Sequence, residues 1–453
     1  MIDSEPGQHS RPNADLQPEI RMANSPRCDS FDRRAFFRTS AAGIAGASLM
    51  GMTACSEETD GPAPDRSAIL PDTPASPTDE AWAPVRAHFI LERGTAYMNN
   101  ASLGMPPGIV AEAVADGYRA ISTEPLHGKH DLQDQIAQVV LPTLARTFGA
   151  DVTEMSLTRN ATEALHLQSL SLALSPGDEV LITTQEHPAG HKPWMVRATR
   201  QGITVREVFI PSPLVSTEDV ITRFAAEITE RTRAVAFCHV TRGGHRYPVR
   251  ELCAFARTRE LVSLVDGAQA VGQFPIDLHD LGCDAYSASM HKWMFGPVGT
   301  GFLYIRAGAR DRFIPEFVPG PATTGAEYAP PGTADFPVRA ALATSLAFVE
   351  RIGLENVEAR CRYLSDYLKE SLSGLDGCTL LSGPRERSAP GSTIFQLDGL
   401  NALESVPLLE ELARTHIDEH QRDGHDAIRV STHVYNTRTE IDRLMEGLHA
   451  ARS

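Results

Sequence analysis

One lysine of this sequence lies where its amine could do covalent chemistry. Lys292 follows a run of small and apolar residues and precedes a turn bounded by Gly296 and Pro297. Upstream, Asp266 ends an apolar run, so a carboxylate and an amine could share one site. Lysine amines form imines, and their pKa falls readily when they are buried or lie beside another cation.

Enzymes that use pyridoxal phosphate (PLP) need this pair of groups. They hold the cofactor covalently on a lysine, while a carboxylate facing the pyridine nitrogen keeps the ring protonated and able to accept electrons. The types and spacing of Asp266 and Lys292 therefore predict PLP as the cofactor. The alternative is that Lys292 is an ordinary solvated surface lysine.

Longer motifs around these residues resemble a known family. The motifs are Asp266-x-x-Gln269, Ser289-x-His291-Lys292 and the glycine-rich run Gly296–Tyr304. They are similar to those of the class V aminotransferase superfamily, which includes cysteine desulfurases, kynureninase and isopenicillin N epimerase-like proteins. The resemblance covers about residues 85–449 and implies an α/β protein of PLP fold type I. Such a protein has a large domain, with a mainly parallel seven-stranded type of sheet covered by helices, and a smaller C-terminal α+β domain.

The resemblance also assigns further residues to the cofactor. Gln269 would hydrogen-bond the phenolic oxygen and favour its charged form. Ser289 and His291 match phosphate contacts of the family. Gly332-Thr333 resembles a pair that reaches the phosphate of the neighbouring subunit, which implies a homodimer with shared active sites.

A helix predicted to start at Asn160 offers a seat for the phosphate. Asn160 is a favourable N-cap, and Glu163 is suitably placed to complete the capping signature. The free N–H groups and the positive dipole end of a helix N-terminus bind anions. In the family the matching turn binds the cofactor phosphate, so the resemblance implies Ala161 and Thr162 as ligands.

Two further segments resemble active-site segments of the family. His187 follows a predicted strand, at the position where many relatives stack an aromatic ring on the pyridine. The alternative is a solvated loop histidine. The turn containing Asn99 resembles the family's opening segment at the active-site mouth, or it is an ordinary turn.

Two arginines are candidates for substrate binding. Arg429 lies in an apolar run that resembles the family's closing strand, whose arginine binds the substrate α-carboxylate in a bidentate manner. An internal ion pair is the alternative for this residue. Arg242 departs from the family pattern, and its guanidinium could bind a second substrate carboxylate or face solvent.

The pattern of the body predicts the elements that position these residues. From residue 152 short apolar runs alternate with helical segments, which is typical of a mainly parallel sheet covered on both faces. Ligands bind such sheets at the carboxyl ends of the strands. We therefore expect His187, His239, Asp266 and the helix start at Asn160 to converge on one crevice. Strands are predicted near 155–158, 179–183, 203–209, 234–240, 261–265, 299–305, 379–381 and 393–397.

Length, composition and charge limit the possible class of protein and its division into segments. Its 453 residues, 42% of them hydrophobic, suffice for a large buried core, and the formal charge of −16 argues against nucleic acid as a partner. We divide the chain into a disordered N-terminus with an export signal (1–55), a linker (56–80), a segment at the active-site mouth (81–110), a large PLP-binding domain (111–335) and a small C-terminal domain (336–453).

The N-terminal segment resembles a twin-arginine export signal. Arg33-Arg34 precedes a weakly hydrophobic run rich in alanine and glycine. The run ends in a sequence similar to a lipoprotein processing box, with Cys55 as the acylated residue. We expect a periplasmic protein or a membrane-anchored lipoprotein. A short buried or amphipathic helix is the alternative for the run, and simple cleavage near Ala54 is the alternative to lipidation.

The cysteines bear on the reaction. None of the seven forms a C-x-x-C pair, so neither a metal site nor a redox motif is indicated, and we expect no disulfides. Beyond Lys292, Cys361 and Cys378 fall in helix-like and strand-like patterns, which disfavours a desulfurase. The sequence favours an isopenicillin N epimerase-like enzyme acting at the α-carbon of an amino acid. The alternatives are a C–S lyase, an aminotransferase and a non-catalytic binding protein of the same fold.

Overall fold

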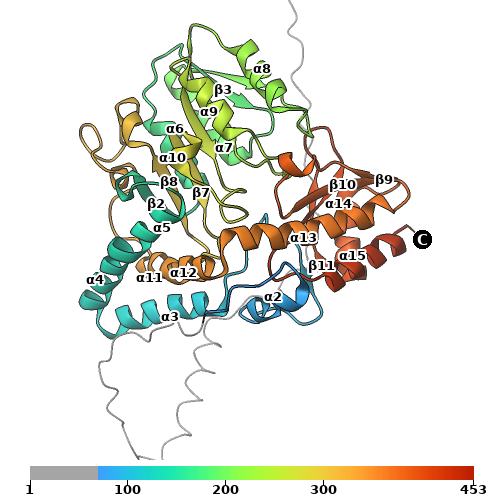
Figure 1. The fold of residues 1–453 in the computed structure, drawn as a ribbon. Coiled ribbons are helices and arrows are strands. Elements are labelled where there is room, and N and C mark those ends of the chain that lie inside the picture. Colours follow the sequence, from blue (N-terminus) through green and yellow to red (C-terminus); the bar gives the residue numbers. More distant parts are fainter. Residues whose placement is uncertain (1–69, 453) are drawn as a thin grey trace, which may run out of the picture. The chain divides into compact units, whose positions relative to one another are not determined.

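The computed structural model describes residues 70–452. Its largest element is a seven-stranded sheet in the order β2-β8-β7-β6-β5-β3-β4 (Figure 1). Neighbouring strands are parallel except at β8, which runs antiparallel to both β2 and β7. The predicted, mainly parallel sheet is confirmed. The strands are β2 Met155–Thr158, β3 Glu179–Thr183, β4 Thr204–Val208, β5 Thr232–Cys238, β6 Val262–Asp266, β7 Ala285–Ser289 and β8 Gly301–Ile305.

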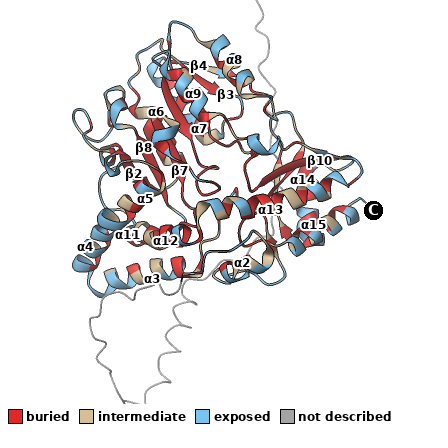
Figure 2. Cartoon of the chain, viewed as in Figure 1, coloured by how far each residue is buried: buried red, intermediate tan, exposed pale blue. Residues whose placement is uncertain are grey.

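Helices cover both faces of this sheet because successive strand residues point to opposite sides. Val180 and Ile182 pack with Trp194 of α7, while Leu181 lies in the core of the other face with Phe224 of α8. Figure 2 shows the strands as buried and the outer sides of the helices as exposed. The helices nearest the sheet are α5 Leu141–Thr147, α6 Ala161–Ser171, α7 Pro188–Gln201, α8 Thr217–Glu227, α9 Val249–Arg257 and α10 Leu278–Leu281.

A second, four-stranded antiparallel sheet has the order β12-β13-β10-β9. Its core is shared with α13, α14 and α15. Nearby, a short parallel pair joins β1 of the N-terminal segment to β11. These elements are β1 Ala96–Tyr97, β9 Cys378–Leu380, β10 Ser392–Leu397, β11 Thr415–His416, β12 Asp418–His420, β13 Ala427–Ser431, α13 Leu354–Ser373, α14 Ala402–Ala413 and α15 Arg438–Ala450.

A break at Pro125 separates the helices that precede the large sheet. α3 (Gly108–Thr123) ends before Pro125, which opens α4 (Pro125–Gln135), and a π-helical turn (Ile136–Val140) leads into α5. The two helices that follow the predicted domain boundary at residue 336 pack on helices that precede the large sheet. α11 (Phe336–Ala340) and α12 (Leu342–Ile352) pack on α3, and α12 also packs on α5. Apolar side chains of α12 belong to the core of the large sheet, whereas α13 contributes to that core and, from Leu364 onward, to the core of the second sheet.

The predicted linker 56–80 is wrong from residue 70 onward. The Nε of Arg351 donates to Pro71 O (3.2 Å), and Arg360 donates to Pro77 O (2.7 Å). α2 (Asp79–Arg86) then starts at the N-cap Thr78. The exposed Arg351 and the buried Arg360 thus hold a stretch whose proline content indicated a flexible chain. The predicted export signal and Cys55 lie outside the described residues.

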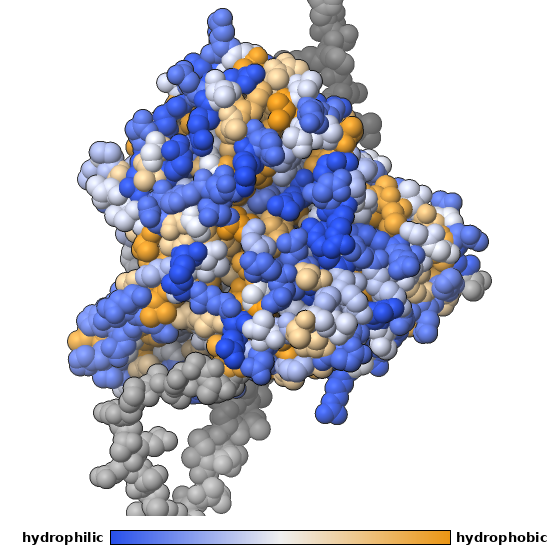
Figure 3. All heavy atoms as spheres, viewed as in Figure 1, coloured by the Kyte–Doolittle hydropathy of each residue, from blue (hydrophilic) through white to orange (hydrophobic). Residues whose placement is uncertain are grey.

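The surface in Figure 3 is mainly hydrophilic, with hydrophobic residues in scattered groups. Between residues 70 and 452, no helix combines the length and apolar character needed to cross a bilayer. The five cysteines in this range are free thiols.

Candidate active site

The turn that carries Lys292 follows β7 and is held by distant segments of the chain. Asn100 donates from Nδ2 to Lys292 O (3.2 Å), and the Gly104 amide donates to His291 O (2.9 Å). From the C-terminal part of the chain, His433 Nε2 donates to Trp293 O (3.1 Å). Segments from the N-terminal and the C-terminal part of the described chain thereby fix the backbone of the lysine turn.

Close packing restricts which residues and backbone conformations fit in this turn. A Cβ on Gly104 would lie 1.8 Å from Lys292 O, so only glycine fits at position 104. Phe295 has a φ of 58°, a left-handed conformation that is strained for a bulky residue. Its ring stacks on His433 at 4.7 Å between centroids, which helps to keep that conformation. Strain of this kind concentrates at functional sites.

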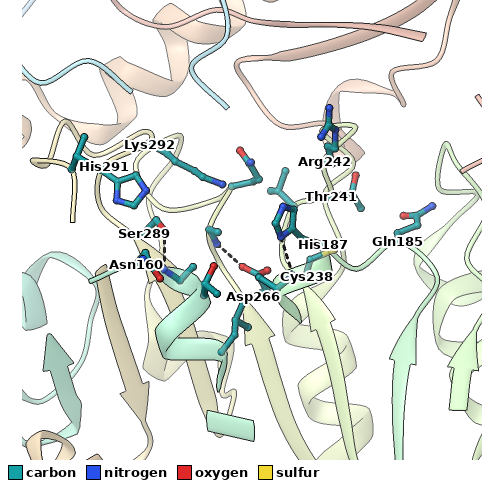
Figure 4. A pocket seen from close by; sticks show the side chains of 18 of the residues that line it. Asn160, Gln185, His187, Cys238, Thr241, Arg242, Asp266, Ser289, His291 and Lys292 are labelled. Carbon is teal, nitrogen blue, oxygen red and sulfur yellow. Dashed lines mark hydrogen bonds between the residues drawn. The ribbon is translucent and has the colours of Figure 1, made fainter. Parts of the chain in front are cut away.

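A cavity of about 350 Å³ opens at the carboxyl ends of the central strands (Figure 4). That volume lies within the range of small-molecule sites. The predicted site residues that line it are Ala161, Thr162, His187, Arg242, Asp266, Gln269, Ser289, His291 and Lys292. Cys238, Thr241 and Gln185 also line the cavity and were missed, because nothing in their local sequence distinguishes them from ordinary strand ends.

The amine of Lys292 lies deep in this cavity. Burial lowers its pKa to about 8, and the positive charges of Arg429 and Arg242 lower it further, while Asp266 acts in the opposite direction. An amine with this pKa is partly neutral near physiological pH. A neutral amine is the form that attacks a carbonyl or accepts a proton.

Asp266 ends β6 and is 6% exposed. Its Oδ1 accepts a hydrogen bond from the Ala268 amide (2.9 Å). Burial raises its pKa, although the Ala268 hydrogen bond and the charge of Lys292 partly offset this. A cation beside the carboxylate would favour its charged form, and a protonated pyridine nitrogen is such a cation.

A second acid, the half-buried Glu186, lies close to Asp266. It accepts hydrogen bonds from Thr183 Oγ1 (2.6 Å) and from the Cys238 amide (3.1 Å). Burial raises its pKa to about 8, and the charge of Asp266 contributes in the same direction. A Cβ on Gly190 would lie 3.2 Å from Glu186 and 3.8 Å from Asp266, so the first turn of α7 closes over both acids. Sequence analysis missed Glu186, which precedes His187 in a loop.

The N-terminus of α6 lies at the cavity, where the sequence predicts a binding site for the phosphate. Asn160 caps the helix by accepting from the Glu163 amide (2.9 Å). Ser289 Oγ accepts from the Ala161 amide (2.8 Å), so the end of β7 meets the start of α6 (Figure 4). His291 donates from Nδ1 to a backbone carbonyl at 3.1 Å, which leaves Nε2 for the cavity. These groups suit a phosphate.

His187 faces Lys292 across the cavity above Asp266 (Figure 4). Its Nδ1 accepts from the Ala189 amide (3.1 Å), which fixes the ring at the N-cap of α7. Burial lowers its pKa to about 4, and the charge of Lys292 adds to this. A neutral imidazole held in this position suits stacking on a cofactor ring, as the family resemblance implies.

The side chain of Gln269 forms two hydrogen bonds within the protein. Its Nε2 donates to Ala101 O (2.8 Å) and its Oε1 accepts from Trp293 Nε1 (3.0 Å). An amide nitrogen carries two hydrogens, so one remains for a ligand. The side chain therefore ties the cavity to the N-terminal segment.

The two candidate arginines meet carboxylates of the small sheet. Arg429, 2% exposed, forms an ion pair with Asp418 and donates to Asn99 Oδ1 (3.2 Å). Burial lowers its pKa to about 10. Arg242 lines the cavity and donates to Glu419 Oε1 at 2.9 Å. The structure thus shows the internal ion pair for Arg429, and a substrate contact for it stays a prediction.

Four residues that the sequence places at the site do not line this cavity. Asn99 and Arg429 are joined beside the cavity but do not line it, and Thr333 is exposed. The expected convergence of His239 on this crevice is wrong. Cys238 and Val240 face the cavity, and the alternation along an extended chain turns His239 to the other side.

These groups together fit PLP. A lysine amine, a buried carboxylate, a helix N-terminus with hydroxyl and imidazole groups, and a neutral histidine ring line one cavity. They correspond to the covalent link, the ring nitrogen, the phosphate and the ring face of that cofactor.

Known proteins share this arrangement. The family model "Aminotransferase class-V" matches residues 96–444. An isopenicillin N epimerase of Streptomyces clavuligerus is 29% identical over 390 residues, which cover 82% of this chain and 98% of that protein. A probable cysteine desulfurase of Halobacterium salinarum is 30% identical over 404 residues, covering 81% and 96% of the two chains.

Solved structures agree with the sequence comparison. A C-DES variant with glycine covalently linked to the PLP cofactor has a TM-score of 0.73 and 27% identity, covering 80% of this chain and 98% of its own. The cystine C–S lyase C-DES in complex with cysteine persulfide has a TM-score of 0.72 and 27% identity, covering 79% and 97%. The protein therefore belongs to the class V aminotransferase family and is a PLP-dependent enzyme.

Proposed function

We propose that this enzyme moves the α-proton of an amino acid or of a small molecule that contains one, as an isopenicillin N epimerase-like enzyme does. When bound, PLP draws electrons from the α-carbon and makes its proton acidic. Lys292, with a pKa of about 8, is suited to take up that proton and to return it. Asp266 would hold the ring nitrogen protonated, while Ala161, Thr162, Ser289 and His291 would hold the phosphate.

The observation that carries this proposal is a basic amine in a cavity without a reactive thiol. Sulfur transfer needs an accessible thiolate in an electropositive setting. Cys238 is the thiol that lines the cavity in the described range, and it is 4% exposed. Burial raises its pKa well above the ordinary value, and the charges of Glu186 and Asp266 raise it further.

The cysteines beyond the lysine are no better suited. Cys361 is fully buried in α13, and burial raises its pKa to about 12. The charges of the adjacent Arg360 and Arg362 lower that pKa, but burial outweighs them. Burial also raises the pKa of Cys378, on β9. Neither thiol lines the cavity.

A second candidate reaction is β-elimination at a C–S bond. The similarity to a cystine C–S lyase favours it, and elimination requires no thiol of the enzyme. Lys292 would again take up the α-proton, and the sulfur group of the substrate would leave from the β-carbon. An aminotransferase would instead release a keto acid and keep the amine.

One experiment separates these reactions. Holoenzyme is incubated in deuterated water with L- and D-amino acids and with cysteine S-conjugates, and products are identified by mass spectrometry and chiral chromatography. We expect α-deuterium with inversion of configuration. Pyruvate with ammonia would overturn the proposal in favour of the lyase, and a keto acid without ammonia in favour of the aminotransferase. Lys292→Ala should abolish exchange, whereas Lys192→Ala, at an exposed position of α7, should not.

We further propose that the protein is exported by the twin-arginine route and acts in the periplasm, either freely or anchored through Cys55. Arg33-Arg34 and the following apolar run support this. We also propose a homodimer in which Thr333 of each chain reaches the phosphate in the other. The exposure of Thr333, away from the cavity of its own chain, is consistent with that arrangement.

A further inference from the structure

A second cavity, of about 450 Å³, lies on the other side of the segment that follows β5. Along this segment Cys238, Val240 and Arg242 line the first cavity, whereas His239 and Arg246 line the second. The remaining walls come from the first turns of α8 and α9 and from residues 386–387. None of the roles proposed for PLP or for the substrate involves this space.

His239 presents an unpartnered polar group to this cavity. The side chain is 2% exposed, and its Nδ1 lies 2.9 Å from Tyr286 Oη. Within residues 70–452 this is the only hydrogen bond of that hydroxyl, so the hydroxyl donates to Nδ1 and the proton of the neutral ring resides on Nε2. Burial lowers the pKa of His239 to about 3, which keeps the ring neutral. Nε2–H has no acceptor in the described part of the chain.

Arg246 presents an unpaired cation to the same space. Its guanidinium lies over the ring of Phe274, 4.3 Å from the centroid. Among the described residues, no carboxylate lies within ion-pair distance of it, although the side chain is half-buried and burial lowers its pKa. A buried charge without a partner is costly, and an anion in the cavity would relieve that cost.

Two helix N-termini meet at this cavity. α8 begins beside Ser216, whose Oγ accepts from a backbone amide at 3.0 Å. α9 begins after Pro248 and has no side-chain cap. Both helix dipoles direct positive potential towards the space. The other charged residues on the wall are Arg250, paired with Asp280; Arg387, paired with Glu386; and Glu251.

We propose that the second cavity binds a small anion with a carboxylate or phosphate group. The guanidinium of Arg246 and the Nε2–H of His239 donate to it, and the uncapped amides of α9 stabilise its charge. His239 lines the second cavity and its neighbours Cys238 and Val240 line the first, so the anion site adjoins the catalytic site without overlapping it. This site is independent of the reaction type proposed above.

The test is isothermal titration of the PLP-loaded full-length enzyme with inorganic phosphate and, separately, with succinate. Loading with PLP fills the phosphate seat at α6, so that seat does not contribute. We expect one site per chain for at least one of the two probes. Arg246→Gln should weaken binding by about tenfold or more, because a charged hydrogen-bond donor is lost. Arg233→Gln, at the other end of β5 and paired with Asp178, should leave binding unchanged.

A second variant keeps the test decisive if Arg246→Gln does not fold. Thr217→Glu places a carboxylate at the first position of α8, where helices favour acids. It should keep the melting temperature and occupy the cavity with its own side chain, so that added anions no longer bind. The proposal is overturned if the wild-type enzyme binds neither probe. It is equally overturned if a folded Arg246→Gln or Thr217→Glu variant binds as the wild type does.

Discussion

The reaction of cofactor-free protein with PLP should report the lowered pKa of Lys292. With a pKa of about 8, roughly one tenth of the amine is neutral at pH 7 and roughly nine tenths at pH 9. The rate of covalent incorporation should therefore rise about tenfold between these pH values and then level off. A lysine at its ordinary pKa would instead gain about tenfold with each pH unit across this whole range.

Two substitutions should move this profile in opposite directions. Asp266→Asn removes the negative charge that raises the pKa of Lys292, so the midpoint should fall below that of the wild type. Arg429→Gln removes a positive charge that lowers the same pKa, so the midpoint should rise. Burial, the largest cause of the shift, stays the same in both variants, so neither should return the lysine to its ordinary value.

The assay is stopped-flow absorbance of PLP mixed with cofactor-free protein from pH 6 to pH 10. Borohydride trapping and peptide mapping then verify attachment at Lys292. Nα-acetyllysine, treated in the same way, corrects for the titration of PLP itself. The electrostatic reasoning is refuted if the protein follows the slope of acetyllysine beyond pH 9, or if the two variants shift the midpoint in the same direction.

Three further predictions concern the substrate, the thiols and export. Arg429→Ala should raise KM and lower kcat/KM by more than about tenfold in steady-state assays, because a charged bidentate contact to the substrate is lost. Unchanged kinetics would mean that Arg429 serves only the ion pair with the four-stranded sheet. Changing Cys361 and Cys378 together to serine should keep turnover within a few-fold, and an inactive variant that still binds PLP would favour a desulfurase. Replacing Arg33 and Arg34 by lysine should retain the protein in the cytoplasm on cell fractionation, whereas finding the unaltered protein there with residues 1–55 intact would contradict export.

Features set by short-range chemistry could be predicted from the sequence. The cap at Asn160 depends on residues three positions apart, and the helix break at Pro125 on the missing amide of proline. The strands of the large sheet are recognisable because both of their faces are buried. The carboxyl ends of parallel strands lie on one edge, so Asp266 and His187 could be placed in one site before the structure was known.

Features set by long-range contacts could not be predicted. The partners of Arg242 are residues of β12, a short strand with no sequence signal of its own. Asn100 holds the lysine turn, but the sequence distinguishes it poorly from Asn99. The linker was misjudged for the same reason, because the arginines that hold residues 71–77 lie in α12 and α13.

The ion pairs around Arg429 and Arg242 affect how the site can bind a substrate carboxylate. Arg429 and Arg242 both contact Asp418, and Arg242 also contacts Glu419, so two cations share two carboxylates beside the cavity. A substrate carboxylate that binds Arg429 must displace Asp418 or join it, and the partly exposed Asp418 can regain water when it is displaced. Binding at this arginine is then an exchange of ion pairs, which contributes less than the Coulomb energy of one pair. Because Asp418 belongs to β12, we expect selectivity at this end of the site to depend on the four-stranded sheet as well as on Arg429.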